Sequence, residues 1–93
     1  MKLYGVFRSA ARADAVSVEL HNEEPTVRSA IGELVSRPGC DELQKLIFER
    51  QGSDPRANAL ILLGGREIDT LAGLDTKLKE NDELSLLPVA HGG

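Results

Sequence analysis

EEPTVRSAIGELVSRPG, residues 23–39, predicts the main helix of the chain. Thr26 can accept hydrogen bonds from the free amide groups of the first turn, and Pro25 lies just outside that turn. Pro38-Gly39 ends the helix. Apolar residues recur between these limits at the spacing of one helical face, namely Val27, Ala30, Ile31, Leu34 and Val35. Because the helix has a single apolar face, another layer of structure must cover that face.

Two strands are predicted before this helix. Residues 2–7 form a short apolar run, which is bounded by the polar run 8–14. Residues 15–21 alternate between apolar and polar side chains, with Val16, Val18 and Leu20 on the apolar side. The loop between the two strands makes them a hairpin.

A shorter helix and a strand are predicted after the main helix. The helix begins near Asp41, and its shared face carries Leu43, Leu46 and Ile47. Residues 57–63 are almost wholly apolar, which predicts a strand that is covered on both faces. Gly64-Gly65 predicts a turn, and residues 66–68 a short return strand.

The last strand is predicted over residues 83–87, after an irregular stretch. Leu84 and Leu86 lie on one face of this strand, and Ser85 and Leu87 lie on the other. Pro88 has no amide hydrogen to donate to a ladder, so strand pairing should fade at that residue.

These elements predict an α+β domain of the β-grasp (ubiquitin-like) class. A mixed sheet of four to five strands packs on one main helix. The rule of right-handed crossovers places the third main strand parallel to one of the first two. We expect one β-grasp domain over residues 1–87 and a flexible C-terminal tail over residues 88–93.

Composition and charge narrow the classes of function. The net charge is −4, and the chain has one Tyr, two Phe and no Trp, which disfavours nucleic-acid binding. No run is apolar for long enough to span a bilayer. Cys40 is the single cysteine, and His21 and His91 lack partners, so we expect neither a disulfide nor a metal site. These features predict a soluble, cytoplasmic monomer with no bound cofactor.

The C-terminal third resembles a known family. Gly65-Arg66-Glu67-Ile68, the stretch LKENDELSLLP (residues 78–88) and the terminal Gly92-Gly93 resemble the MoaD/ThiS-like sulfur carriers. These carriers include the small subunit of molybdopterin synthase and the small archaeal modifier proteins. His91-Gly92-Gly93 is also similar to the end of the eukaryotic ubiquitin-related modifier. Molybdopterin subunits usually carry two prolines and an aromatic residue before the tail, whereas this chain has only Pro88, which favours the modifier branch.

The resemblance implies a carrier or modifier that is a substrate of enzymes and has no catalytic residues of its own. An E1-like adenylyltransferase would use ATP to activate the carboxylate of Gly93. A thiocarboxylate or thioester would then serve sulfur transfer, with a sulfur donor system, or isopeptide conjugation to lysines of target proteins. Gly92 keeps the tail narrow, Pro88 stiffens its root, and His91 fits a groove of the partner.

Three apolar residues are predicted to contact partners. Leu87 should point outward beside the tail, and the resemblance adds Phe7 and Ile68 to an exposed apolar cluster. Two alternatives to the modifier stay open. One is the small subunit of molybdopterin synthase, which would deliver sulfur to a pterin precursor together with a large subunit. The other is a non-catalytic β-grasp interaction domain.

Overall fold

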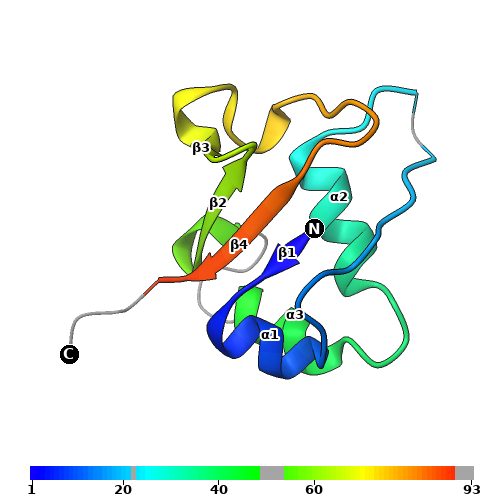
Figure 1. Cartoon of the computed structure of the whole chain (residues 1–93), viewed down its shortest axis with the longest axis vertical. Coiled ribbons are helices and arrows are strands. Elements are labelled where there is room, and N and C mark those ends of the chain that lie inside the picture. The colour runs from blue at the N-terminus through cyan, green and yellow to red at the C-terminus, as the bar shows by residue number, and fades with distance from the viewer. Residues whose placement is uncertain (22, 49–53, 90–93) are drawn as a thin grey trace.

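The computed structural model describes residues 1–21, 23–48 and 54–89. Its sheet has the strand order β1-β4-β2-β3 (Figure 1). β1 runs parallel to β4, and the other neighbours are antiparallel. The predicted mixed sheet is therefore confirmed. The strand bounds are β1 (Lys2–Leu3), β2 (Ala59–Leu63), β3 (Arg66–Glu67) and β4 (Leu84–Pro88).

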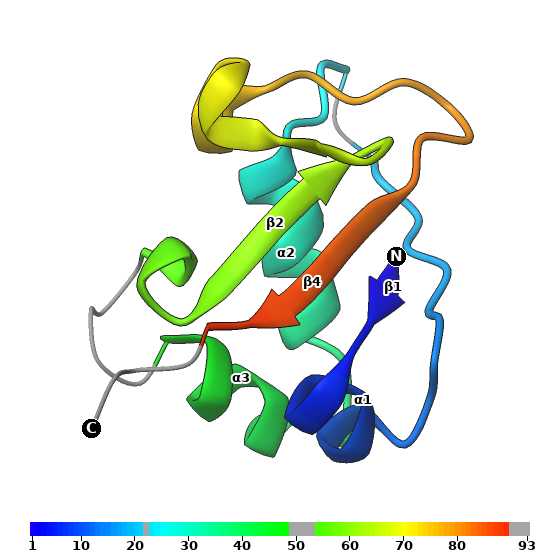
Figure 2. The ribbon, with the colours of Figure 1, turned by 60° about the vertical axis from the view of Figure 1, so that its left-hand side comes forward.

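Helices form the second layer. α2 crosses behind β2 and β4, while α1 and α3 lie at one end of the sheet (Figure 2). Three short 3-10 turns connect the remaining segments. The bounds are α1 (Gly5–Ala11), α2 (Val27–Val35), α3 (Asp41–Phe48), η1 (Pro55–Ala57), η2 (Ile68–Thr70) and η3 (Gly73–Asp75). Aliphatic side chains from both layers and the single buried aromatic side chain of Phe7 make one core.

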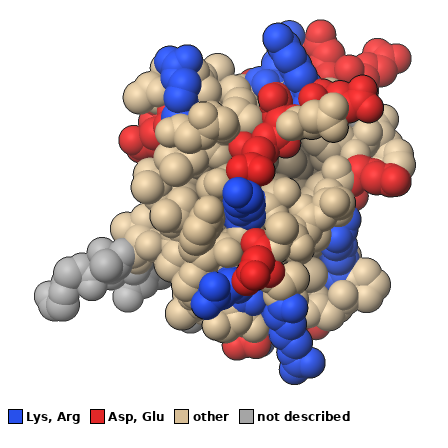
Figure 3. Space-filling view, in the orientation of Figure 1, with Lys and Arg blue, Asp and Glu red and all other residues tan. Residues whose placement is uncertain are grey.

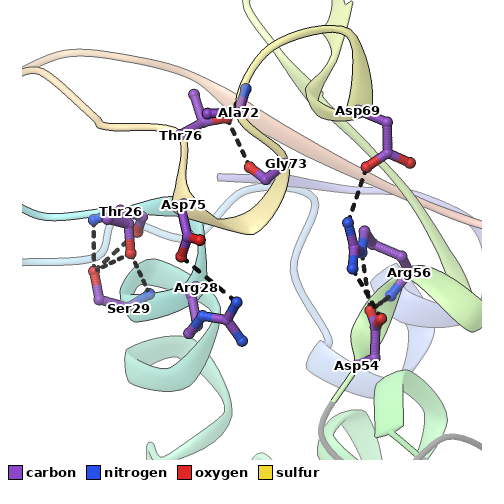
Figure 4. Close-up of polar contacts among 10 residues, drawn as sticks. All are labelled: Thr26, Arg28, Ser29, Asp54, Arg56, Asp69, Ala72, Gly73, Asp75 and Thr76. Carbon is purple, nitrogen blue, oxygen red and sulfur yellow. Dashed lines mark hydrogen bonds and ion pairs between the residues drawn. The ribbon is translucent and has the colours of Figure 1, made fainter.

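The helix over Val27–Val35 follows its sequence signals closely. The Ser29 amide donates to Thr26 Oγ1 at 3.2 Å, and the Thr26 amide donates to Ser29 Oγ at 2.8 Å (Figure 4). This reciprocal capping box satisfies two amide groups that would otherwise lack a partner. The five predicted apolar residues are all buried, and the helix ends before Pro38-Gly39.

We expect Thr26→Ala to lower the free energy of unfolding by about 1 kcal/mol, because the Ser29 amide loses its acceptor. Urea unfolding followed by circular dichroism measures the change. Ser36→Ala is the matched control, since its hydroxyl only donates to the Gly32 carbonyl at the exposed end of the same helix. An equal loss in both variants would contradict a specific role for the cap.

The predicted first strand is mostly wrong. β1 ends at Leu3, and the chain turns into α1 at Gly5, which has a φ of +56°. A Cβ on Gly5 would also lie 2.8 Å from Pro88 Cγ, so both the backbone angle and the available space favour glycine. For the residues that follow the turn, the sequence predicts the end of a strand and a polar loop. They instead form a helix that carries Phe7 into the core.

The predicted second strand has the right pattern of burial but no ladder. Val16, Val18 and Leu20 are half-buried, and the residues between them are exposed. The predicted hairpin is reduced to one antiparallel bridge between Lys2 and Ala15, flanked by backbone hydrogen bonds between Met1 and Val16 and from Leu3 to Asp14. β1 is too short to pair with more of residues 15–21. β2 runs antiparallel to β1 and therefore in the same direction as the segment that begins at Ala15, whereas the strand that pairs in parallel with β1 is β4.

β2 is covered on one face only, which corrects the expectation of two covered faces. Ala59 and Ile61 are buried toward the helices, whereas Leu60 is 36% exposed. The described helices and turns therefore leave one side of the central strands open. Gly64-Gly65 makes the predicted turn into β3.

Candidate functional site

The open face of the sheet presents apolar side chains in the middle of β2 and β4. Leu60 pairs with Leu87 across these strands. Leu84 and Leu86 are buried in the core, so Leu87 points the other way and is half-buried. The position of Leu87 on the outward face of β4 agrees with the sequence-based expectation.

Further apolar residues extend this face toward its edges. Tyr4 is 42% exposed and Val89 is 40% exposed. The register of β1 and β4 places Tyr4 opposite Leu87, and Val89 follows Leu87 by two residues on the same side. We define the outer patch as Tyr4, Leu60, Leu62, Leu87 and Val89. The left half of Figure 3, over β2 and β4, is mostly free of charged side chains. Exposed apolar patches of this kind mark interaction sites.

The strand that carries the outer patch ends at Pro88, and a backbone hydrogen bond holds the next residue, Val89. Pro88 lies within β4 opposite Ala59, and the Val89 amide donates to the Asn58 carbonyl at 3.0 Å. The ladder ends at Pro88, where the sequence predicts that pairing fades, and one further hydrogen bond follows at Val89. Amide directions alternate along a strand, so the missing donor of Pro88 faces the side where β1 has already ended. The chain reaches Val89 in a fixed direction.

A cluster of charged groups borders the outer patch. Arg56 donates through Nε and Nη2 to the two carboxylate oxygens of Asp54, each at 3.0 Å, and through Nη1 to Asp69 at 3.1 Å (Figure 4). Arg56, Asp69 and Glu67 line a cavity of about 160 Å³ together with Leu60 and Val89. The apolar patch therefore has a polar rim close to the last described residue.

The hydrogen bonds within this cluster shift the pKa values of both Asp54 and Arg56. The side-chain hydrogen bond from Arg56, followed by its backbone hydrogen bond, lowers the pKa of Asp54. Hydrogen bonding to Asp54 and then to Asp69 raises the pKa of Arg56. At neutral pH, Arg56 and Asp54 are therefore held as an ion pair.

We expect Asp54→Asn to destabilise the fold slightly, by less than about 1 kcal/mol, because both side chains of the pair are about two-fifths exposed. The folded-state pKa of Asp54 is depressed, so its stabilisation is present at neutral pH and is lost as the pH falls through that pKa. Thermal unfolding at pH 7 and in acid should show the difference between the two chains shrinking on acidification. A difference that grows in acid would contradict this assignment.

The structure separates the predicted partner contacts. Leu87 lies in the outer patch, but Phe7 and Ile68 are each 1% exposed and belong to the core. Their expected exposure is wrong, because Phe7 lies on the inner side of α1 and Ile68 begins the turn η2. Gly93, Gly92 and His91 lie outside the described residues. Sequence reasoning missed Tyr4, Leu60, Leu62 and Val89, because an apolar run such as residues 57–63 does not reveal which of its side chains face outward.

Two other properties of the described residues bear on function. Within residues 1–21, 23–48 and 54–89, no three His, Cys, Asp or Glu side chains gather as the ligands of a metal ion would. Among the helices of the same residues, none combines the length and the apolar character that crossing a membrane requires.

Comparison with solved structures places this architecture among known proteins. The crystal structure of SAMP1 from Haloferax volcanii matches with a TM-score of 0.79 and 26% identity, covering 99% of this chain and 94% of that one. The solution structure of small archaeal modifier protein 1 from Methanosarcina acetivorans matches with a TM-score of 0.77 and 29% identity, over 99% and 92% of the two chains. The chain has the β-grasp fold of the small archaeal modifier proteins.

The β-grasp fold of the small archaeal modifiers extends to a more distant structure. A chain of the Amycolatopsis orientalis BexX/CysO complex matches with a TM-score of 0.70 over 99% of this chain and 96% of that one. At 19% identity this likeness shows a shared fold alone. No protein-family model matches the sequence, and no curated protein is similar enough to match it. The likenesses to the two small archaeal modifier proteins, at 26% and 29% identity, support the class of ubiquitin-like modifiers.

Proposed function

We propose that this chain is a ubiquitin-like modifier and sulfur carrier whose terminal carboxylate, on Gly93, is activated by an E1-like adenylyltransferase. The observation that carries the proposal is the outer patch on β4, the strand that leads directly into the sequence Ala90-His91-Gly92-Gly93. A partner that covers Leu60 and Leu87 is thereby brought next to the end on which the chemistry takes place.

The proposed chemistry takes place on the carboxylate of Gly93. One oxygen of that carboxylate attacks the α-phosphorus of ATP, and pyrophosphate leaves. A sulfur nucleophile then attacks the carbonyl carbon of the acyl adenylate, and AMP leaves. An enzyme thiolate gives a thioester in this step, whereas hydrosulfide from a sulfur donor system gives a thiocarboxylate. A lysine amine of a target protein then attacks the carbonyl carbon of the thioester, the enzyme thiolate leaves, and the nitrogen loses a proton to give an isopeptide bond. ATP is a substrate of the activating enzyme, so the chain needs no bound cofactor.

The short distance between the outer patch and Gly93 supports separate roles for them, in which the patch binds the enzyme and the tail carries the reacting group. Gly93 is the fourth residue after Val89, so the distance between them is at most about 14 Å at roughly 3.4 Å per residue. An enzyme that docks on the outer patch can therefore hold its adenylation site within the reach of the terminus. The absence of a Cβ on Gly92 and Gly93 suits passage through a narrow channel.

Intact mass spectrometry tests the carrier role. The full chain is incubated with a purified activating enzyme, ATP and a sulfur donor. Exchange of one oxygen for sulfur, localised to Gly93 by fragmentation, is the expected result. An unchanged mass, with an enzyme that is active on its own substrate, would overturn the proposal.

We expect the double substitution Leu60→Thr and Leu87→Thr to weaken binding of the activating enzyme about tenfold or more. These side chains form the centre of the patch, and central apolar contacts dominate interface energies. Threonine preserves the preference for strand structure. Leu71→Thr is the control, since Leu71 is also half-buried but lies outside the patch and the core cluster. Isothermal calorimetry measures the affinities, and equal losses in both proteins would argue against docking on the patch.

The small subunit of a molybdopterin synthase is the second candidate, because the outer patch is also a surface that an obligate subunit would bury. Pull-down from cells separates the two functions. Lysine-linked conjugates that carry a Gly-Gly remnant support the modifier, whereas a stoichiometric complex with one large subunit supports the synthase. The lone Pro88 before the tail is the reason that we favour the modifier.

A further inference from the structure

A groove of about 710 Å³ opens beyond the N-terminal end of β1. Residues 17–21 form one wall, and residues 79–82 form the other. Met1 and Leu84 also line it. The upper right part of Figure 3 shows acidic side chains gathered around a hollow near the loop that precedes β4. The groove and the outer patch share no lining residue.

The groove has the width of one missing strand. Lys2 pairs with Ala15 on one side and with Ser85 on the other. The two flanking segments therefore stand two strand spacings apart at this point, roughly 10 Å. None of the described residues lies between these two segments next to Met1.

Backbone groups on the first wall point into this gap. The Val16 amide donates to the Met1 carbonyl at 2.8 Å, and the Met1 amino group donates to the Val16 carbonyl at 2.7 Å. Strand alternation then directs the amides and carbonyls of Val18 and Leu20 toward the same side. Within the described part of the chain, neither residue has a backbone hydrogen bond. These groups can pair with an added strand.

The second wall offers a matching group. The Tyr4 amide donates to the Leu86 carbonyl at 3.2 Å. The backbone amides and carbonyls of even-numbered residues in β4 therefore point toward β1. The Leu84 amide therefore points to the position that would precede Met1 in a longer β1. Both walls thus present main-chain groups to the same empty row.

The side chains around the groove define the chemistry of its occupant. Val18 and Leu20 are half-buried, and Leu84 is 4% exposed, so the floor is apolar. The exposed carboxylates of Glu19, Glu80 and Asp82 line the groove, against two ammonium groups, the side chain of Lys79 and the N-terminus of Met1. His21 lines it as well. An alternation of small apolar and cationic side chains matches such a floor and rim.

We propose that this groove binds an extended, cationic segment of a partner protein as an added strand in line with β1. The main chain of the segment pairs with Val18 and Leu20 on one side and with Leu84 on the other. Its apolar side chains cover the floor, and its Lys or Arg side chains meet Glu19, Glu80 and Asp82. The groove lies at the Leu84 end of β4 and the outer patch toward the Val89 end, so both surfaces can be occupied at once. The proposal does not depend on the activation of Gly93.

Titration of the ¹⁵N-labelled full chain with the pentapeptide acetyl-Arg-Val-Lys-Val-Arg-amide tests the proposal. Shifts concentrated on the amides of Val18, Leu20 and Leu84 are expected. The same peptide with methyl groups on its two central amide nitrogens should bind about tenfold more weakly, because it loses main-chain donors. The peptide acetyl-Glu-Val-Glu-Val-Glu-amide should not bind. Equal affinity of the methylated peptide, shifts elsewhere, or no binding at millimolar concentration would each overturn the proposal.

A pair of proline variants tests the same contact from the side of the protein. Val18→Pro removes an amide that faces the groove, whereas Ser17→Pro removes its neighbour, which faces away. We expect about tenfold weaker binding for Val18→Pro and less than a twofold change for Ser17→Pro. If either variant unfolds, as shown by loss of dispersion in its spectrum, binding of the methylated peptide to the unsubstituted chain decides whether main-chain pairing contributes to affinity. Concentration-dependent shifts of the same amides without peptide would assign the groove to a second copy of the chain and overturn the proposal.

Discussion

A chain that lacks Gly92 and Gly93 is expected to form no adenylate, no thiocarboxylate and no conjugate, while its free energy of unfolding stays the same. The loss should be complete, since deletion moves the reacting carboxylate from Gly93 to His91. Stability should hold because the described core and sheet end at Val89, whose amide still donates to Asn58. Intact mass spectrometry with the activating enzyme, ATP and a sulfur donor gives the first result, and urea unfolding gives the second.

A chain extended by one alanine after Gly93 is the sharper control for this deletion. It keeps every native residue and moves only the carboxylate, so it should be equally inactive. If the deleted chain still acquired sulfur or formed conjugates, the proposed function would fail. If all cellular activities survived the deletion, the chain would be a non-catalytic β-grasp interaction domain.

Phe7→Ala is expected to lower the free energy of unfolding by about 3–5 kcal/mol, the largest effect of any single substitution considered for this chain. Phe7 is 1% exposed and is the largest of the fully buried side chains. It packs in the same core as Leu43, Ile47 and Leu86, so its loss would leave a cavity between α1, α3 and the sheet. The midpoint of thermal unfolding should fall by more than about 10 °C, as measured by circular dichroism.

Val6→Ala is the matched control, because Val6 is the preceding residue on the same helix and is 52% exposed. It should change stability by less than about 0.5 kcal/mol. If Phe7→Ala changed the free energy of unfolding only slightly but weakened binding of a partner, the partner contact that the family resemblance implied for Phe7 would be supported instead.

The parts of the fold that local chemistry dictates could be predicted from the sequence. Thr26, the spacing of apolar residues after it and Pro38-Gly39 define α2 without reference to the rest of the chain. Leu84 and Leu86 likewise define the inner face of β4. α1 was missed because its start depends on a distant contact, in which Pro88 leaves room only for glycine at position 5.

The site could be predicted only where strand alternation was enough. The sequence predicts that Leu87 points outward, because Leu84 and Leu86 lie on the opposite face of the strand and are packed in the core. Leu60 could not be placed, because an apolar run does not reveal which of its faces the helices cover. Ile68 was misplaced for a related reason: β3 has only two residues, both exposed, so its alternation does not extend to the turn that follows.

The central position of β4 also determines how the molecule bears mechanical load. Two residue pairs join β4 to β1, and five join it to β2. A pull applied at the C-terminal end acts along β4 and loads both ladders in shear, so their hydrogen bonds must yield together. A pull at Met1 acts first on the two-residue β1, which is joined to β4 by two residue pairs and to Ala15 by one bridge. An unfoldase that pulls from the C-terminal end should therefore unfold the chain more slowly than one that pulls from Met1, since forced unfolding is governed by the unfolding rate.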